Sequence, residues 1–293
     1  MKRILTAFAA VAILQGSLAG QAGGKVFISA DMEGISGISG SDQLSATGSE
    51  YNRSRKFMAD DVNAAIAGAF AAGATEVLVN DSHGSMRNLR LEDLDSRARL
   101  ISHSFKQFGM MQGLDETFAA VIFVGYHAKA GSPHGLFAHT GSGVVADVRV
   151  NGRSLGEGGL NTLVSEWYGV PVVAVTGDDA AVKEVTSVAT SARGVVVKRA
   201  INPRAVELLP FQWVHAEITK AAREGVGAAT RITPKREKSY QVEVQLREIA
   251  IPEVAQHLPG MRRPQPDTIA FTAETMPKAY TLIRVLYRYI NPD

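Results

Sequence analysis

Short, almost continuous apolar runs alternate along this chain with longer segments whose apolar residues recur at helical spacing. The runs are of strand length, whereas the segment from Tyr51 to Ala72 carries its apolar residues on one face of a helix and stops at Gly73. Strands that alternate with helices predict an α/β fold: a mostly parallel sheet flanked by helices. The predicted strands are residues 25–30, 76–80, 119–125 and 171–176, and the further predicted helices are 158–167 and 178–189.

The pattern changes after about residue 210. A helical stretch over 211–223 is followed by an alternating strand over 240–246, a strand near 269–271 and a helix over 276–289. We interpret this region as a smaller α+β portion. An alternating segment at 144–150 runs into Asn151-Gly152, a strong hairpin signal. The predicted division is a signal peptide over 1–22, a catalytic α/β domain over 23–209 and a C-terminal α+β subdomain over 210–293.

The first residues have the pattern of an export signal. Lys2 and Arg3 precede a short apolar stretch, and small residues follow at Ser17 and Ala19 and at Gly20 and Ala22. The apolar stretch is shorter than the roughly 20 residues of a membrane span. We expect a periplasmic or secreted protein without stable membrane insertion; an uncleaved N-terminal anchor is the alternative.

Composition excludes several classes of function. The chain has 293 residues, 45% of them hydrophobic, and a formal net charge of +2, so it lacks the basic footprint of a nucleic-acid-binding protein. It contains no cysteine and therefore no disulfide, thiolate nucleophile or cysteine-based metal site. Any metal must be held by imidazole and carboxylate groups, which suits zinc and its neighbours.

Ligand-type side chains follow the ends of three predicted strands. Asp31 and Glu33 come after the first strand, Asp81 and His83 after the second, and His127 after the third. The carboxyl ends of parallel strands meet at one edge of a sheet, where such folds keep their sites. This placement indicates a metal site. Taken singly, each aspartate is also typical of a cap or turn, and each histidine of a structural residue.

Several blocks of sequence resemble the motifs of the DppA-type D-aminopeptidases, in the same order. The resemblance covers about residues 26–179 and is weaker toward the C-terminus. Its blocks are Ser-Ala-Asp31-Met-Glu33-Gly-Ile-Ser-Gly, Val-Asn-Asp-Ser-His83, Gly-Tyr-His127-Ala, Gly-Glu157-Gly-Gly-Leu-Asn and Val-Thr-Gly-Asp-Asp179.

The resemblance implies a zinc-dependent aminopeptidase with two zinc ions, acting through a hydroxide between them on short, D-alanyl peptides. Asp31 would bridge both ions, with Glu33 and His83 at one and His127 and Glu157 at the other. His139 matches the position of the family's catalytic histidine, and His134 is the competing residue. A ring-like homo-oligomer that takes small peptides is also implied.

Two features depart from the family pattern. The segment Ala138-His139-Thr140-Gly141-Ser-Gly143 is smaller than the bulkier, more apolar stretch of the family, which puts substrate preference in question. The export signal is the second departure. Asp81 and Asp178 are candidates to bind the substrate's amino group, with loop and helix capping as the alternative for both.

Two other functions remain open at this point. Another dinuclear hydrolase, an amidase or a phosphoesterase, would use the same ligands. A periplasmic solute-binding protein would also be exported and α/β, although it needs no convergence of five metal ligands.

Overall fold

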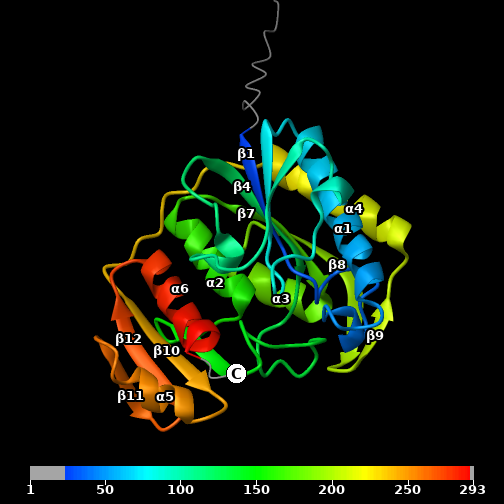
Figure 1. The fold of residues 1–293 in the computed structure, drawn as a ribbon. Helices are drawn as coiled ribbons and strands as arrows, with labels where there is room; N and C mark the ends of the chain where they lie inside the picture. Colours follow the sequence, from blue (N-terminus) through cyan, green and yellow to red (C-terminus); the bar gives the residue numbers. More distant parts are fainter. Residues whose placement is uncertain (1–23, 291–293) are drawn as a thin grey trace, which may run out of the picture.

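The computed structural model describes residues 24–290, which form two sheets and their covering helices (Figure 1). The predicted signal peptide over 1–22 lies outside the described residues. The larger sheet has seven strands in the order β3-β2-β1-β4-β7-β8-β9, and the smaller has five in the order β11-β12-β10-β5-β6. Among the described helices, none has the length and apolar character needed to cross a membrane.

The larger sheet is parallel apart from its last strand, which confirms the predicted α/β class. Strand β9 runs antiparallel to β8, and every other neighbouring pair in this sheet is parallel. Its strands are β1 (Lys25–Ala30), β2 (Glu76–Asp81), β3 (Ala98–Ile101), β4 (Phe118–Tyr126), β7 (Val172–Asp178), β8 (Arg193–Asn202) and β9 (Ala205–Leu208).

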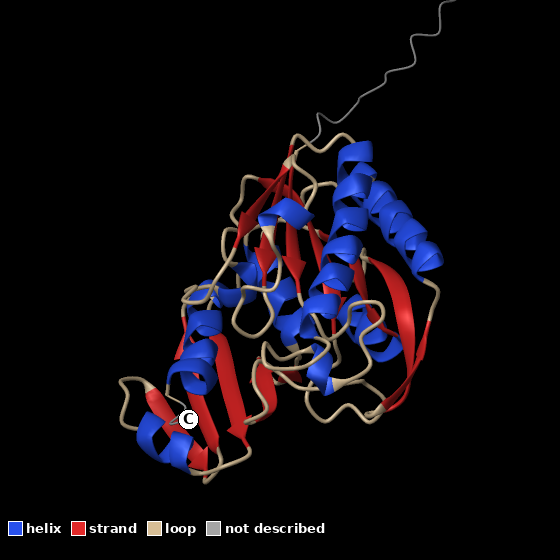
Figure 2. Cartoon of the chain, turned by 45° about the vertical axis from the view of Figure 1, so that its right-hand side comes forward, coloured by secondary structure: helices blue, strands red, loops and turns tan. Residues whose placement is uncertain are grey.

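Helices cover both faces of this sheet (Figure 2). Helices α1 (Tyr51–Ala71) and α4 (Phe211–Gly227) pack together on one face, and α2 (Glu157–Trp167) and α3 (Asp179–Val188) cover the other. Side chains of β1 therefore alternate between two cores: Val26, Ile28 and Ala30 pack toward α1, and Phe27 packs toward α2. Burial on both faces explains why the strands read as continuous apolar runs.

The smaller sheet is antiparallel and is buried on one face only. Its central strand β10 alternates strictly between buried and exposed residues, and the buried ones share a core with α2 and α6. Its strands are β5 (Val145–Val150), β6 (Arg153–Ser154), β10 (Tyr240–Leu246), β11 (Met261–Gln265) and β12 (Thr268–Ala273). Its helices are α5 (Ala250–Ala255), α6 (Met276–Arg284) and the π-helical turn η4 (Val285–Tyr289).

The layers do not divide at residue 210, where the sequence predicted a subdomain boundary. Helix α4 follows residue 210 but packs on α1, whereas β5 and β6 precede it and pair within the smaller sheet. The hairpin at Asn151-Gly152 is confirmed, with both residues at positive φ. Because β5 contributes to the sheet formed by the C-terminal strands, the chain crosses between the two portions more than once.

The carboxyl ends of the central strands meet at one edge of the larger sheet, as predicted. Ala30 pairs with Asp81 of β2, and the backbone N–H of Asp31 donates to the carbonyl of Val124 in β4 at 2.8 Å. Gly125 makes this close approach possible. It has φ +74°, and a Cβ there would lie 2.3 Å from the carbonyl oxygen of Asp31.

Candidate metal centre

Two groups of ligand-type side chains gather at this edge of the sheet. One consists of Asp31, Glu33 and His83, and the other of His127, His139 and Glu157. Within each group the potential ligand atoms lie within 4.8 Å of one another. The structure thus brings together the five predicted metal ligands and the predicted catalytic histidine, although they come from loops far apart in sequence.

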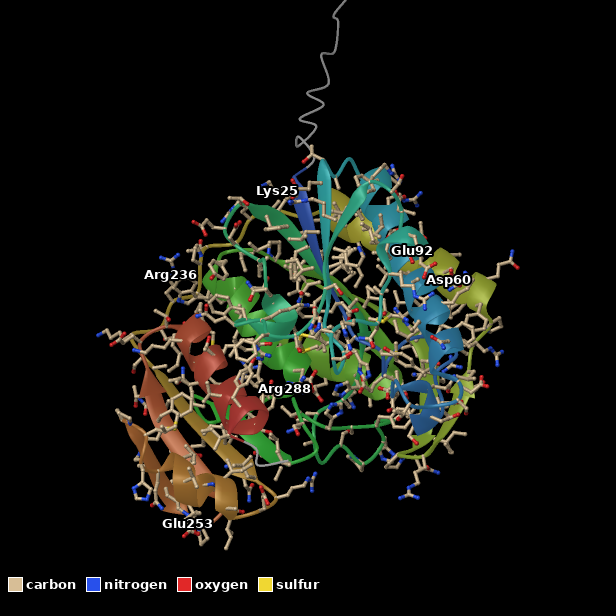
Figure 3. The ribbon with its side chains drawn as sticks, in the orientation of Figure 1. Lys25, Asp60, Glu92, Arg236, Glu253 and Arg288 are labelled. Atoms are coloured by element: carbon tan, nitrogen blue, oxygen red, sulfur yellow. The ribbon has the colours of Figure 1, made fainter. Side chains whose placement is uncertain are left out.

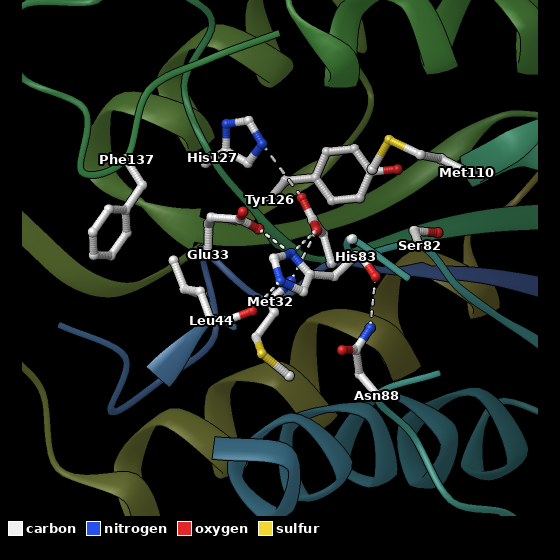
Figure 4. Close-up of polar contacts among 12 residues, drawn as sticks. Met32, Glu33, Leu44, Ser82, His83, Asn88, Met110, Tyr126, His127 and Phe137 are labelled. Atoms are coloured by element: carbon white, nitrogen blue, oxygen red, sulfur yellow. Dashed lines mark hydrogen bonds and ion pairs between the residues drawn. The ribbon is translucent and has the colours of Figure 1, made fainter. Parts of the chain in front are cut away.

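His83 is held between a backbone carbonyl and two carboxylates (Figure 4). Its Nε2 lies 2.8 Å from the carbonyl oxygen of Leu44, so this nitrogen carries the proton and donates it. Its Nδ1 lies 2.8 Å from Glu33 Oε2 and 3.4 Å from Asp31 Oδ1. The unshared electron pair of Nδ1 therefore points at the carboxylates, where only a proton or a cation can sit between them.

His127 also lies between a backbone carbonyl and two carboxylates, but the roles of its two ring nitrogens are the reverse of those in His83. Nδ1 donates to the carbonyl of Ala128 at 3.0 Å, and Nε2 lies 3.4 Å from both Asp31 Oδ2 and Glu157 Oε2. Nε2 is buried and has no hydrogen-bond partner. Metal-binding histidines in proteins usually donate their other N–H to a carbonyl or carboxylate. The carboxylate-imidazole donor set and the unpartnered nitrogen both fit a metal ion.

Glu157 and His139 complete the second group. Glu157 begins helix α2, and its Oε1 accepts a hydrogen bond from the backbone of Gly141. His139 stacks on His127 with ring centroids 4.0 Å apart, and its Nε2 lies 3.7 Å from Glu157 Oε1. Its Nδ1 donates to the carbonyl of Phe137 at 2.8 Å. His139 is thus close enough to join a ligand set, and its assignment as catalyst stays a prediction.

Charges in the centre favour bound cations. Burial, reinforced by the charge of Glu33, raises the pKa of Asp31 to about 7. Burial also works against ionised Glu157, but His127 overcomes it and lowers the pKa of that carboxyl to about 2. The carboxylates in turn raise the pKa of His83 well above its ordinary value, despite its burial. Divalent cations relieve the repulsion between three carboxylates that lie this close together and so stabilise their ionised forms.

A buried lysine holds the loop that carries Glu33. Lys198, in β8, is fully buried, and its ammonium group donates to the backbone carbonyls of Glu33, Ile35 (3.0 Å) and Ile38 (2.9 Å). Burial lowers the pKa of Lys198 to about 7, and the three acceptors together with Asp178 favour its charged form. The loop after β1 is therefore fixed by a side chain of β8, a strand further along the same sheet.

Comparison with known proteins agrees with this geometry. The profile of the D-aminopeptidase family matches residues 25–285. The chain belongs to the D-aminopeptidase family. A D-aminopeptidase of Bacillus subtilis (strain 168) is 36% identical over 264 residues, covering 89% of this chain and 96% of the relative. The solved structure of the Zn-dependent D-aminopeptidase DppA from Bacillus subtilis, described as a self-compartmentalizing protease, superposes with a TM-score of 0.88 at 34% identity and covers 92% of this chain and 98% of its own.

Membership of the D-aminopeptidase family confirms the resemblance predicted from the motifs. It makes this chain a peptidase and decides against the phosphoesterase and solute-binding alternatives. The match to DppA extends through both sheets, so the smaller sheet is part of the shared fold.

Three other candidate residues lie outside the centre. Asp81 accepts hydrogen bonds from the backbone of Asn88 and Leu89, and Asp178 caps helix α3 through the N–H of Ala181. Asp81 therefore holds a loop and Asp178 caps a helix, which are the roles given as their alternatives. His134 is exposed and lines a separate surface pocket beside Asp179 and Lys183.

Sequence reasoning missed the residues that support or enclose the centre. Lys198 carried a detectable signal, a charge at the end of the apolar run Gly-Val-Val-Val-Lys. Arg284, Tyr287 and Arg288 line the same pocket as Asp31 but come from the end of the chain. Their helix was predicted, but nothing local to it indicates which part of the larger sheet it reaches.

Proposed function

We propose that this chain is a zinc-dependent aminopeptidase that removes an N-terminal D-residue from short peptides. The position of Asp31 carries the proposal, because its two carboxylate oxygens each lie 3.4 Å from a different histidine, His83 and His127. One carboxylate between two ligand groups is the arrangement that a pair of neighbouring cations needs. The Bacillus subtilis relative, described as Zn-dependent, supports zinc as the metal.

Five side chains would hold the two ions. Glu33 and His83 would bind one, His127 and Glu157 the other, and Asp31 would contribute one oxygen to each. Zinc, when bound, lowers the pKa of a coordinated water and polarises a peptide carbonyl. The backbone of Leu44 and of Ala128 fixes the two imidazoles, so that the correct nitrogen faces the ions.

His139 would move a proton during the reaction. Its side chain is 29% exposed, in contrast to the buried ring of His127, so a substrate in the pocket can reach it. The hydrogen bond to Phe137 occupies Nδ1 and leaves Nε2 as the atom that receives or delivers the proton. Delivery to the departing amine is the step for which a positioned imidazole is best suited at neutral pH.

The pocket supports a small N-terminal side chain. Its volume is about 130 Å³, and Met86 and Met110 are among the residues that line it. A methyl group fits such a space, which makes D-alanyl peptides the first substrates to test. Flexible thioether side chains also adapt to small differences in ligand shape.

The proposed activity is tested by offering D-Ala-D-Ala, L-Ala-L-Ala and a simple phosphomonoester to the purified mature protein with zinc. We expect the D-dipeptide to be cleaved at least about tenfold faster than the L-dipeptide, a difference of about 1.4 kcal/mol in transition-state binding. Equal rates on both dipeptides would remove the D preference. Cleavage of the phosphoester alone would overturn the peptidase assignment for this site.

We further propose a homo-oligomer and export from the cytoplasm. The self-compartmentalizing description of the relative supports assembly, as do Leu208, Phe211 and Trp213, three large apolar side chains exposed on β9 and α4. Light scattering at micromolar concentration tests assembly, and a monomeric mass would contradict it. Export rests on the pattern of residues 1–22, and a native protein that keeps Met1 in the cytoplasm would contradict it.

A further inference from the structure

The end of the chain forms one wall of the pocket over the metal centre. Helix α6 lies against α2 and the smaller sheet, and its continuation η4 brings Tyr287 and Arg288 to the pocket beside Glu157 and His139. In Figure 3 the labelled Arg288 projects from the end of this last helix toward the middle of the molecule. A segment that is remote in sequence from the ligands is thus placed where the substrate must lie.

The ring of Tyr287 occupies the space beside Gly141 in which a side chain at that position would lie. Gly141 has φ +70°, and a Cβ at this position would lie 2.4 Å from the Tyr287 ring. A larger residue at 141 and this tyrosine therefore exclude each other. The absence of a side chain at Gly141 thus lets a ring from η4 form this part of the pocket wall.

The two arginines of the wall have different environments. Arg284 is buried, and its Nη1 donates to the backbone carbonyls of Lys106 and Gln107 (3.0 Å). Arg288 is exposed, and Nη2 donates at 3.2 Å to the carbonyl of Gly84, the residue after His83. Within residues 24–290 no carboxylate forms an ion pair with Arg288. Its guanidinium is therefore held beside a metal ligand with most of its N–H groups free.

The charges of the pocket favour an anion at Arg288. The other ionisable lining groups are Arg284, Tyr287 and the carboxylates and histidines of the metal centre, so every carboxylate of the lining belongs to that centre and none is left to pair with this arginine. A guanidinium fork matches a carboxylate with two parallel hydrogen bonds. A peptide of two residues spans about 7 Å when extended, so its carboxylate stays within a small pocket.

We propose that Arg288 binds the C-terminal carboxylate of a dipeptide substrate, with Tyr287 closing the pocket behind it. This inference rests on the proposed aminopeptidase function and deepens it by naming the substrate class: dipeptides with a free carboxylate. Each added residue moves the carboxylate about 3.5 Å further from the metal centre, so longer peptides lose this contact. The preference for short peptides then comes from this chain's own last helix.

The test compares D-Ala-D-Ala, its C-terminal amide and the D-Ala tripeptide as substrates of the zinc-loaded mature enzyme. The variants are Arg288→Gln, Arg288→Lys and the control Arg263→Gln, whose guanidinium donates to Pro266 in the smaller sheet, away from the pocket. We expect the wild type to prefer the free dipeptide over its amide by about 10–100-fold in kcat/KM. Arg288→Gln should abolish that preference, mainly through KM, and Arg288→Lys should keep part of it. Zinc content should not change.

A binding measurement separates this inference from the proposed function. The probe is the D-Ala-D-Ala analogue with a reduced, non-hydrolysable peptide link, as acid and as amide, titrated by calorimetry. Tighter binding of the acid that is lost in Arg288→Gln supports the carboxylate contact, even if no peptide is cleaved and the function fails. If the wild type cleaves and binds the acid and the amide equally well, the carboxylate contact is overturned while the peptidase function stands. The same follows if Arg288→Gln loses activity and affinity equally for the acid and the amide. An absence of both cleavage and binding would overturn both.

Discussion

The parallel and antiparallel sheets contribute to the pocket in different ways. The parallel sheet delivers its side chains through loops that leave adjacent strand ends, so Asp31, His83 and His127 need only short connections to converge. The antiparallel sheet contributes nothing from its own strands. It supports α6, and the last residue of that helix and the following turn η4 line the pocket, through Arg284, Tyr287 and Arg288. The ligands are thus placed by local chain geometry, and the wall by packing between distant segments.

This difference suggests that the two regions have different roles. The strand-end loops are fixed by buried hydrogen bonds, such as those from Lys198, and hold groups whose positions the chemistry requires. The helix end carries the exposed Arg288 and the half-buried Tyr287, neither of which belongs to the two ligand groups. Substitutions in the first region should therefore remove metal or stability, whereas those in the second should change which substrate is accepted.

Asp31→Ala should have the largest effect. With one fewer carboxylate between two cations, we expect loss of at least one metal ion and a fall in activity of more than about 10³-fold, beyond the 10–100-fold typical of residues that only support a ligand. Metal analysis and peptide hydrolysis measure both effects. Asp267→Ala, an exposed aspartate beside β12, is the control and should keep its metal and activity. An Asp31→Ala variant that still binds both metal ions would show that Asp31 is not shared between them.

His139→Ala should lower kcat by about 10²–10⁴ while zinc is retained, because the residue is proposed to act on protons and not to bind metal. His134→Ala is the control, since its side chain is exposed in a separate pocket. Release of zinc from His139→Ala would instead make His139 a ligand together with His127 and Glu157, the group that its position also allows.

Lys198→Met should destabilise the protein by about 3 kcal/mol, because each buried carbonyl that loses its donor costs about 1–3 kcal/mol. The carbonyls of Glu33, Ile35 and Ile38 would all be affected, so zinc affinity should fall as well. Urea unfolding and zinc titration measure the two effects. Lys235→Met, which removes an exposed lysine paired with Glu166, is the control. Unchanged zinc affinity would mean that the loop does not depend on Lys198.

Gly141→Ala should lower the free energy of unfolding by about 1–2 kcal/mol because of the positive φ alone. The contact of the added Cβ with the Tyr287 ring should lower it further. Tyr287→Ala in the same chain should restore the part due to the contact. Unfolding measurements on the two single variants and the double variant give the coupling energy. Additive effects would mean that the helix end does not press on this loop.

The smallest effect concerns Lys106, which donates to Asn80 and to the carbonyl of Asp81. Burial lowers the pKa of Lys106 to about 8, below its ordinary value of about 10.4 in an unfolded chain. Between these two pH values the unfolded state binds more protons, so stability rises with pH. Compared with Lys106→Met, the wild type should therefore gain unfolding free energy as the pH rises from 8 to 10. A constant difference between the two would contradict the shift.

The sequence predicted what depends on local pattern. Alternating strands and helices indicated the parallel sheet, and the positions of Asp31, His83 and His127 after strand ends indicated one shared edge. Glu157 could be named only through the family resemblance, because a glutamate in the first turn of a helix is common. Its hydrogen bond to Gly141 and its approach to His127 become visible only in three dimensions.

Other parts of the fold depend on contacts that no local signal records. The residues of β8 and β9 were not predicted as strands, since two charged residues, Lys198 and Arg199, directly follow the short apolar run of β8. Helix α4 was expected with the C-terminal portion but packs on α1, because its apolar face matches that helix. The approach of Tyr287 to Gly141 joins residues far apart in sequence, and neither residue alone indicates the other.

The most direct test of a metal centre built around Asp31 is a calorimetric titration of zinc into the metal-free protein, with hydrolysis of D-Ala-D-Ala followed in the same samples. The two ligand groups joined by Asp31 predict two zinc ions per chain, with activity appearing as the sites fill. A single zinc ion, or full activity before any zinc has been added, would contradict a centre built around Asp31.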